Sequence, residues 1–447
     1  MADKNYWLRS GTYTLLQRLF TVLFGFGSFA ILVRYLSKDD FGIYALFISV
    51  SSLIEVARIG LIQNALIKFL SSAKDEDYKE IISSSFFLNI LVTVILVAVL
   101  VIAAPFLGTL WNSEKIVPLF YLYTITTVIL IFFHQFNYLQ QANLDFRGFF
   151  FSNFARHGSF FLMVIAEVYF IKPDADLNRL VIYLSVGAVL GTLTSFGFGK
   201  KYLRMAGYIS REWVKRLFQY GKYVFGTNIS TMLFTSIDQF MLGTMLPTSS
   251  VAVFNTANRV NNLIDVPVSS VAAIVFPQSA KRASEEGHDT AARLYEKSVG
   301  VLVAILLPAL FFMFLLADWV IIIIAGSAYL ESAPILRVIL ITAFFQPFVR
   351  QFGTIMDSVG RPKTNFYLIM IISLLNVASN YIFIKAFGTI GAALGTLVTM
   401  ALFTVIAQIL LKKYLQVRLI SVFAQIPETY MEVFRIGAQA MAKIKKR

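Results

Sequence analysis

The chain has 447 residues, of which 57% are hydrophobic and only 14% are charged, and its formal net charge is +14. A soluble domain carries about a quarter charged residues, so this composition excludes a mainly water-exposed surface. The absence of cysteine excludes disulfides, thiol catalysis and zinc–thiolate or iron–sulfur sites. The three histidines, His134, His157 and His288, are too scattered to predict a metal site.

Apolar stretches long enough to cross a bilayer recur along the chain. A helix needs about 20 apolar residues to cross the hydrocarbon core. We expect twelve such helices, at residues 12–34, 42–67, 81–104, 118–139, 149–171, 180–199, 221–246, 250–276, 298–320, 333–356, 365–386 and 390–411. The predicted fold class is all-α, a polytopic membrane protein. The run 319–325 either extends the ninth span or forms a short re-entrant hairpin.

The basic residues are distributed unevenly between the two sides of these spans. With the N-terminus inside, 26 Lys and Arg residues fall in inside segments and six in outside loops. Basic residues gather on the cytoplasmic side of membrane proteins, so we expect both termini in the cytoplasm. The basic residues are scattered over short loops. This distribution argues against a nucleic-acid partner, which requires a basic patch on a water-exposed domain.

The strongly basic connector at 200–216 divides the spans into two sets of six. We expect an N-terminal lobe at 1–199, a basic cytoplasmic linker at 200–220, a C-terminal lobe at 221–413 and a basic cytoplasmic tail at 414–447. The tail is interpreted as a helix on the anionic inner leaflet, with disorder as the alternative. The halves also echo each other at an offset of about 210 residues, as in carriers built from repeats.

Polar residues recur at helical spacing within several spans. An ionisable group at membrane depth costs at least ~2.5–3.5 kcal/mol and normally faces protein or water. Such stripes occur in the first, seventh and eighth spans, so we expect them to line a shared polar cleft. They comprise Thr14, Arg18 and Thr21; Thr231, Thr235 and Asp238; and Asn255, Asn258, Arg259, Asn262 and Asp265.

Arginine exceeds acid on the predicted inner half of the spans. Arg18, Arg58, Arg156 and Arg350 all lie nearer the predicted cytoplasmic end. Arginine binds phosphate through its planar fork, so a phosphorylated substrate entering from the cytoplasm is indicated. Together with Arg259, these residues form the predicted phosphate-binding site.

Several charges keep two interpretations. Glu55 and Arg58 are three residues apart on one helix, so they form a structural pair or serve substrate or ion binding. Asp238 and Arg259 likewise pair structurally or function directly. Glu55, Asp238 and Asp265 are candidate sites for coupling to Na⁺ or H⁺, and no other cofactor is expected. His134 and His157 are expected as hydrogen-bonded packing residues, and Glu167 is expected near the outer membrane interface.

Motifs for soluble chemistry are absent from the sequence. It contains no Walker A loop, no G-x-S-x-G and no H-E-x-x-H. The predicted outside loops are too short to hold a polymerase or ligase site. We therefore expect a transporter and not an enzyme.

Several short segments, in this order and spacing, resemble bacterial oligosaccharide flippases of the Wzx type. These belong to the polysaccharide transport branch of the multidrug/oligosaccharidyl-lipid/polysaccharide superfamily. The segments are RYLSKDDFGIYA at 34–45, Gly60, Leu61, 65–67, Asp238, Leu242, Gly243, 251–259, Phe276, Pro277, Gly326, Tyr329, 334–337, DSVGRPK at 357–363 and GAALG at 391–395.

The resemblance implies two six-helix lobes in a V shape around a cationic central cavity. It implies translocation of an undecaprenyl-diphosphate-linked oligosaccharide across the bacterial cytoplasmic membrane, for surface polysaccharide or O-antigen synthesis. Arg18 and Arg259 occupy places where related lipid II flippases carry cavity arginines. Expected partners are the lipid-linked oligosaccharide, the membrane, and glycosyltransferases or a polymerase of the pathway, with the chain itself a monomer. The alternatives are a multidrug/cation antiporter on the same fold, a membrane glycan polymerase or ligase, and a non-transporting scaffold.

Overall fold

The computed structural model describes residues 4–171, 176–286 and 288–444, and every regular element in these ranges is a helix. Ten helices are long and apolar enough to cross a membrane. The α-helices are α1 (Lys4–Tyr35), α2 (Lys38–Leu70), α3 (Asp75–Leu110), α4 (Ile116–Ala142), α5 (Phe146–Ala166), α6 (Leu177–Gly199), α7 (Arg211–Met245), α8 (Thr248–Glu286), α9 (His288–Leu315), α10 (Ala317–Ala325), α11 (Ser332–Ser358), α12 (Pro362–Phe387), α13 (Thr389–Leu415) and α14 (Leu419–Ile444).

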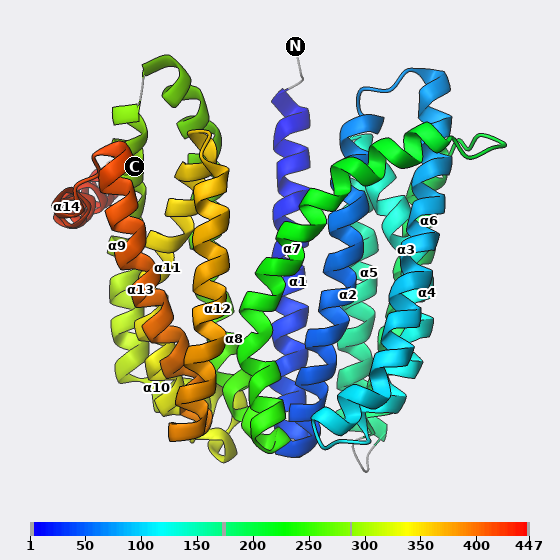
Figure 1. Cartoon of the computed structure of the whole chain (residues 1–447), viewed down its shortest axis with the longest axis horizontal. Coiled ribbons are helices and arrows are strands. Elements are labelled where there is room, and N and C mark those ends of the chain that lie inside the picture. Colours follow the sequence, from blue (N-terminus) through cyan, green and yellow to red (C-terminus); the bar gives the residue numbers. More distant parts are fainter. Residues whose placement is uncertain (1–3, 172–175, 287, 445–447) are drawn as a thin grey trace. The chain divides into compact units, whose positions relative to one another are not determined.

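The chain folds as two compact units, Met1–Ala252 and Val253–Arg447. In the first unit α1 packs on α5, α6 packs on α4 and α5, and α2 packs on α7, α4 and α3 (Figure 1). Local capping begins several of these helices. The hydroxyl of Ser37 accepts from the amide of Asp40 at 3.1 Å, and Asp145 accepts from the amide of Gly148 at 3.2 Å. Such caps satisfy amides that have no partner within the helix.

Helix α7 lies against α2 at backbone distance. A Cβ added to Gly221 would lie 1.8 Å from the carbonyl oxygen of Leu61, and one added to Gly42 would lie 1.8 Å from that of Thr248. Glycine therefore sets the separation of the chain segments at both ends of this contact. Between these ends, Ser49 donates to Gln239 Oε1 at 2.8 Å.

The second unit is built around α11, which packs on α9, α12 and α13 (Figure 1). Helices α12 and α13 meet at a tight turn in which Gly388 has φ +66°. Helix α14 packs on α9. The run 319–325 neither lengthens α9 nor lies in a hairpin of its own: it belongs to the separate short helix α10, which begins after Leu316.

The predicted fold class is confirmed, and nine of the twelve expected ranges fall within the ten spanning helices, while a tenth, 298–320, overlaps α9 but extends five residues past its end at Leu315. The other two, 221–246 and 250–276, fall in α7 and α8, which are helical but are not among those ten. The count of twelve, the lobe boundaries and the V-shaped cavity stay predictions. The predicted tail at 414–447 is helical over most of its length, as α14.

Candidate functional site

A cluster of charged and aromatic side chains joins α2, α4 and α5 inside the first unit. Glu55 of α2 forms an ion pair with Arg156 of α5, with 2.8 Å between Oε1 and Nη2. Tyr123 of α4 donates its hydroxyl to the same oxygen at 2.8 Å. Nε2 of His134, also on α4, lies 3.9 Å from Oε2 of Glu55. The carboxylate of Glu55 therefore has partners from two other helices.

The face of α4 that meets this carboxylate carries polar and aromatic groups at helical spacing. Tyr123, Thr127, His134 and Tyr138 are separated by four, seven and four residues, which places them on one side of the helix. The rings of His134 and Tyr138 stack with centroids 5.7 Å apart. The guanidinium of Arg156 lies 5.1 Å from the ring centroid of Phe133, within the range of a cation–π contact.

Arg58 is the fully buried cation of this cluster. Its side chain has no exposed surface, and Nη1 donates to the carbonyl of Thr127 at 2.9 Å and to Thr93 Oγ1 at 3.5 Å. Within the described residues, its Nε and Nη2 have no acceptor. A buried, incompletely paired cation costs several kcal/mol, so Glu55 one turn away is the charge that stabilises it. In this conformation Arg58 has no surface with which to contact a substrate.

The cluster holds two guanidinium groups against one carboxylate. The side chains of Glu55 and Arg156 are 21% and 15% exposed, whereas Arg58 has no exposed surface. Chemically, the partly exposed pair could open, so that Glu55 accepts another cation or Arg156 another anion.

The second unit contains a looser ion pair. Arg350 of α11 lies 3.4 Å from Asp265 of α8, between Nη2 and Oδ2, and both side chains are about half exposed. One turn before Arg350, Gln346 donates to Asn261 of α8 at 2.8 Å. The structure thus brings together two predicted site residues, Arg350 and Asp265, that are 85 positions apart in the sequence.

The polar residues of the predicted stripes on α1, α7 and α8 are exposed or half-buried. Arg18 is exposed on α1 and has no acidic partner within the described part of the chain, while Thr21 accepts from Gln17 at 3.2 Å. Thr231 and Thr235 are exposed on α7 and donate to carbonyls of their own helix. Thr14, Asp238, Asn255, Asn258 and Arg259 are half-buried, and Asn262 is exposed. Whether these stripes share one cleft stays a prediction.

One expectation differs from the structure: Glu55 pairs with Arg156 and not with Arg58, because α5 lies close enough to offer a guanidinium at hydrogen-bond distance. Glu167 is buried within the protein, where it pairs with Arg179 at 2.9 Å and accepts from Tyr183 at 2.6 Å, and its place at the outer membrane interface stays a prediction.

Tyr123, Thr127 and Tyr138 are site residues that the sequence pattern did not single out. Their spacing with His134 was the available signal, but single polar or aromatic residues in an apolar span do not show which partners they meet.

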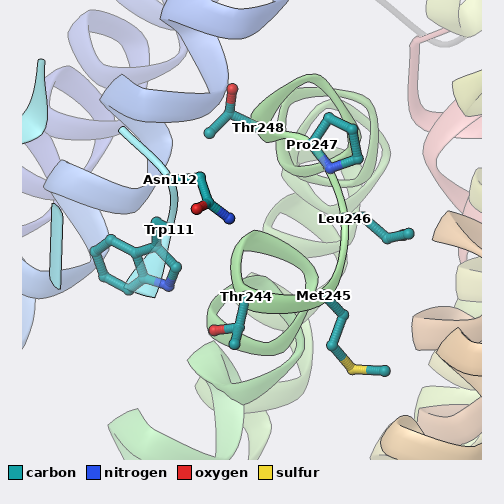
Figure 2. Close-up of a pocket in the computed structure, with 7 residues that line it drawn as sticks. All are labelled: Trp111, Asn112, Thr244, Met245, Leu246, Pro247 and Thr248. Atoms are coloured by element: carbon teal, nitrogen blue, oxygen red, sulfur yellow. The ribbon is translucent and has the colours of Figure 1, made fainter. Parts of the chain in front are cut away.

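A pocket of about 440 Å³ in the first unit lies away from these groups. Figure 2 shows its lining, from the turn after α3 and the turn between α7 and α8. None of the predicted site residues lines it; the lining residues are Trp111, Asn112, Thr244, Met245, Leu246, Pro247 and Thr248. Across the described ranges, no group of three or more His, Asp or Glu residues could hold a metal ion.

The long apolar helices of the described ranges define a multi-span α-helical membrane protein. The likeness to solved structures concerns the fold alone. The lipid II flippase MurJ in an inward closed conformation gives a TM-score of 0.77 at 14% identity, over 96% of this chain and 92% of that one. An inward-facing multidrug resistance MATE family transporter gives 0.74 at 17% identity, over 88% and 96%.

The family model described as "Polysaccharide biosynthesis protein" matches residues 31–334, more than half of the chain, and the chain belongs to this family. An uncharacterized membrane protein of Methanocaldococcus jannaschii is 24% identical over 88% of this chain and 84% of its own length. The "Probable low-salt glycan biosynthesis flippase" of Haloferax volcanii is 24% identical over 46% of this chain and 43% of its own length. That second match spans less than half of either protein.

Proposed function

We propose that this protein is a flippase that moves an undecaprenyl-diphosphate-linked oligosaccharide from the inner to the outer leaflet by alternating access. Family membership and the flippase among its relatives support this function. The structural observation that carries the proposal is Arg18, an exposed arginine on a spanning helix without an acidic partner in the described residues. A cation at membrane depth is costly unless a ligand or water compensates it, and a diphosphate supplies that compensation.

The proposed site uses the exposed arginines first. Arg18 and Arg350 have accessible guanidinium groups, whereas Arg156 is engaged by Glu55 and Arg58 is buried. Arg350 is held only by a long contact to Asp265, so a diphosphate can replace that carboxylate at little cost. In this proposal Arg18 is the phosphate-binding group of the first unit, and Arg156 of the same unit becomes available only after Glu55 is released. In the second unit the proposed phosphate-binding groups are Arg350 and Arg259. Arg58 remains buried and stabilises the charge cluster around Glu55 without contacting the headgroup.

Coupling to Na⁺ or H⁺ is proposed at Glu55, Asp238 or Asp265. Glu55 supports this proposal most directly, because cation or proton binding there would release Arg156. We place the protein in the bacterial cytoplasmic membrane as a monomer with both termini in the cytoplasm, supported by the excess of basic residues on one side. Glycosyltransferases or a polymerase are proposed as pathway partners.

The test replaces Arg18 by Ala and by Lys in cells that lack the native gene, with surface polysaccharide and membrane-inserted protein measured together. We expect Arg18→Ala to abolish surface polymer at unchanged protein level and Arg18→Lys to restore part of it, because lysine keeps the charge but not the fork. Normal polymer from Arg18→Ala would contradict the proposal.

A multidrug/cation antiporter on the same fold is the second candidate, because a MATE transporter shares the fold. Such an antiporter should favour acid over base at its site. The exposed Arg18 argues for an anionic cargo instead. Drug-resistance assays on the deletion strain separate the two functions: lost resistance with normal surface polymer would favour the antiporter.

A further inference from the structure

Helix α14 differs in direction from the other long helices of its unit. It follows α13 after Gln416, whose φ of +57° turns the chain at the end of the span. Figure 1 shows α14 nearly end-on beside α9, whereas the axes of α9 and α13 lie close to the plane of the page. The axis of α14 therefore crosses those of the helices it packs on, as expected for a helix that lies along a membrane surface.

Contacts with α9 fix where α14 crosses. The amide of Arg418 donates to Glu296 Oε1 at 2.7 Å, and the hydroxyl of Tyr430 donates to the carbonyl of Ala304 at 2.7 Å. Between them, a Cβ on Gly300 would lie 2.4 Å from Cβ of Gln425, so glycine permits the close crossing. Glu296 and Gly300 lie in the first half of the spanning segment Thr290–Leu315, and Ala304 lies just past its midpoint. This is the end at which α9 begins and α13 ends.

Three faces of α14 meet three environments. Val422 is fully buried, on the side toward α9. Ile420, Phe423 and Met431 follow at i, i+3 and i+11 on a second face and are exposed, Ile420 by 85% and Met431 by 65%. A third, polar face carries the exposed side chains of Glu428, Glu432 and Arg435, at i, i+4 and i+7.

The junction between α13 and α14 adds positive charge beside the apolar face. Lys412 and Lys413 close α13, Arg418 precedes α14, and all three side chains are exposed. Basic residues at a membrane surface each strengthen attraction to anionic lipid by about fivefold. The apolar and basic surfaces thus have the combination that anionic phospholipid recognises.

We propose that α14 is an interfacial helix bound to anionic phospholipid at the end of the second unit where α9 begins. Ile420, Phe423 and Met431 insert among the acyl chains, and Lys412, Lys413 and Arg418 bind the phosphate headgroups. A crosswise axis, an exposed apolar face beside a charged one and an adjoining basic cluster select the bilayer over a soluble protein as the occupant. None of these residues belongs to the proposed cargo site. The lipid-binding proposal is therefore tested independently of the flippase proposal.

The chain contains no cysteine, so single-cysteine spin labelling of the full-length protein tests the proposal directly. Ile420→Cys and Met431→Cys sample the apolar face, and Glu428→Cys and Arg435→Cys are matched controls on the same helix. In bilayers containing phosphatidylglycerol, the first two labels should collide mainly with oxygen and the controls mainly with a water-soluble nickel complex. Equal accessibility of both pairs, or spin–spin broadening at Ile420→Cys from a second copy, would overturn it.

Binding of the phosphate headgroups by the basic residues is tested by a separate measurement. Replacing Lys412, Lys413 and Arg418 together by Gln should remove roughly a hundredfold of the preference of the purified protein for phosphatidylglycerol over phosphatidylcholine. The variant Glu428→Gln, which changes a charge on the polar face, should leave that preference within about twofold. Unchanged preference in the triple variant would refute headgroup binding.

Discussion

The close contact between α2 and α7 gives a sharp stability prediction, because two glycines of α7 have opposite surroundings. A Cβ on Gly221 would meet the carbonyl oxygen of Leu61 at 1.8 Å, whereas a Cβ on Gly226 would meet nothing within 4 Å. Ordinary contacts begin near 3.4 Å, so Gly221→Ala must move the two helices apart by about 1.6 Å. The oxygen belongs to the backbone, so no side chain can rotate away to relieve the overlap.

The magnitude follows from two opposing effects. Alanine gains about 1 kcal/mol over glycine inside a helix, and this gain applies at both positions. Overpacking costs about 1–3 kcal/mol, occasionally more, and applies only at Gly221. We therefore expect Gly226→Ala to be neutral or slightly stabilising and Gly221→Ala to be less stable than Gly226→Ala by about 1–3 kcal/mol.

Thermal unfolding in detergent, followed by loss of the monodisperse peak in size-exclusion chromatography, orders the wild type and the two variants. Gly42→Ala provides a second test, at the neighbouring contact of α2 with the start of α8, because its Cβ would lie 1.8 Å from the carbonyl oxygen of Thr248. Equal stability of Gly221→Ala and Gly226→Ala would refute the reasoning that glycine sets the α2–α7 separation.

Three further predictions concern charged groups. Glu55→Gln should destabilise the protein by on the order of 3 kcal/mol by leaving two guanidinium groups without their carboxylate, and Arg156→Gln in the same chain should restore part of this in a double-mutant cycle. Burial raises the pKa of Asp145, but hydrogen bonds from Lys201 and from the amide of Gly148 outweigh it and lower that pKa below its ordinary value. Its charge therefore stabilises the protein above the ordinary pKa of about 3.9, and this contribution is lost as the pH falls through the lowered pKa. Asp145→Asn should be less stable at neutral pH, with the difference in unfolding temperature shrinking in acid; a pH-independent difference would contradict this.

The spans could be predicted because the bilayer restricts the chain to long apolar helices, a constraint that is local in sequence. Pairing of charges could not, because it depends on which helices become neighbours. Glu55 and Arg58 share one helix face, yet Glu55 finds its partner 101 positions away in Arg156. The same reason explains Asp265 and Arg350, whose proximity requires α8 and α11 to pack. Spacing shows which residues share a face but not what that face meets.

Helix α7 is too polar for a simple lipid-facing span, and its faces meet different surroundings. One face packs on α2 through Gly221, the buried Gln239 and Gly243, while Thr231 and Thr235 are exposed on another. Both threonines donate to carbonyls of their own helix, which lowers the cost of an apolar environment but leaves their lone pairs without donors. Water or a polyhydroxylated cargo would supply those donors, and lipid would not. The exposed face of α7 therefore remains the best candidate in the first unit for the surface along which a glycan would pass.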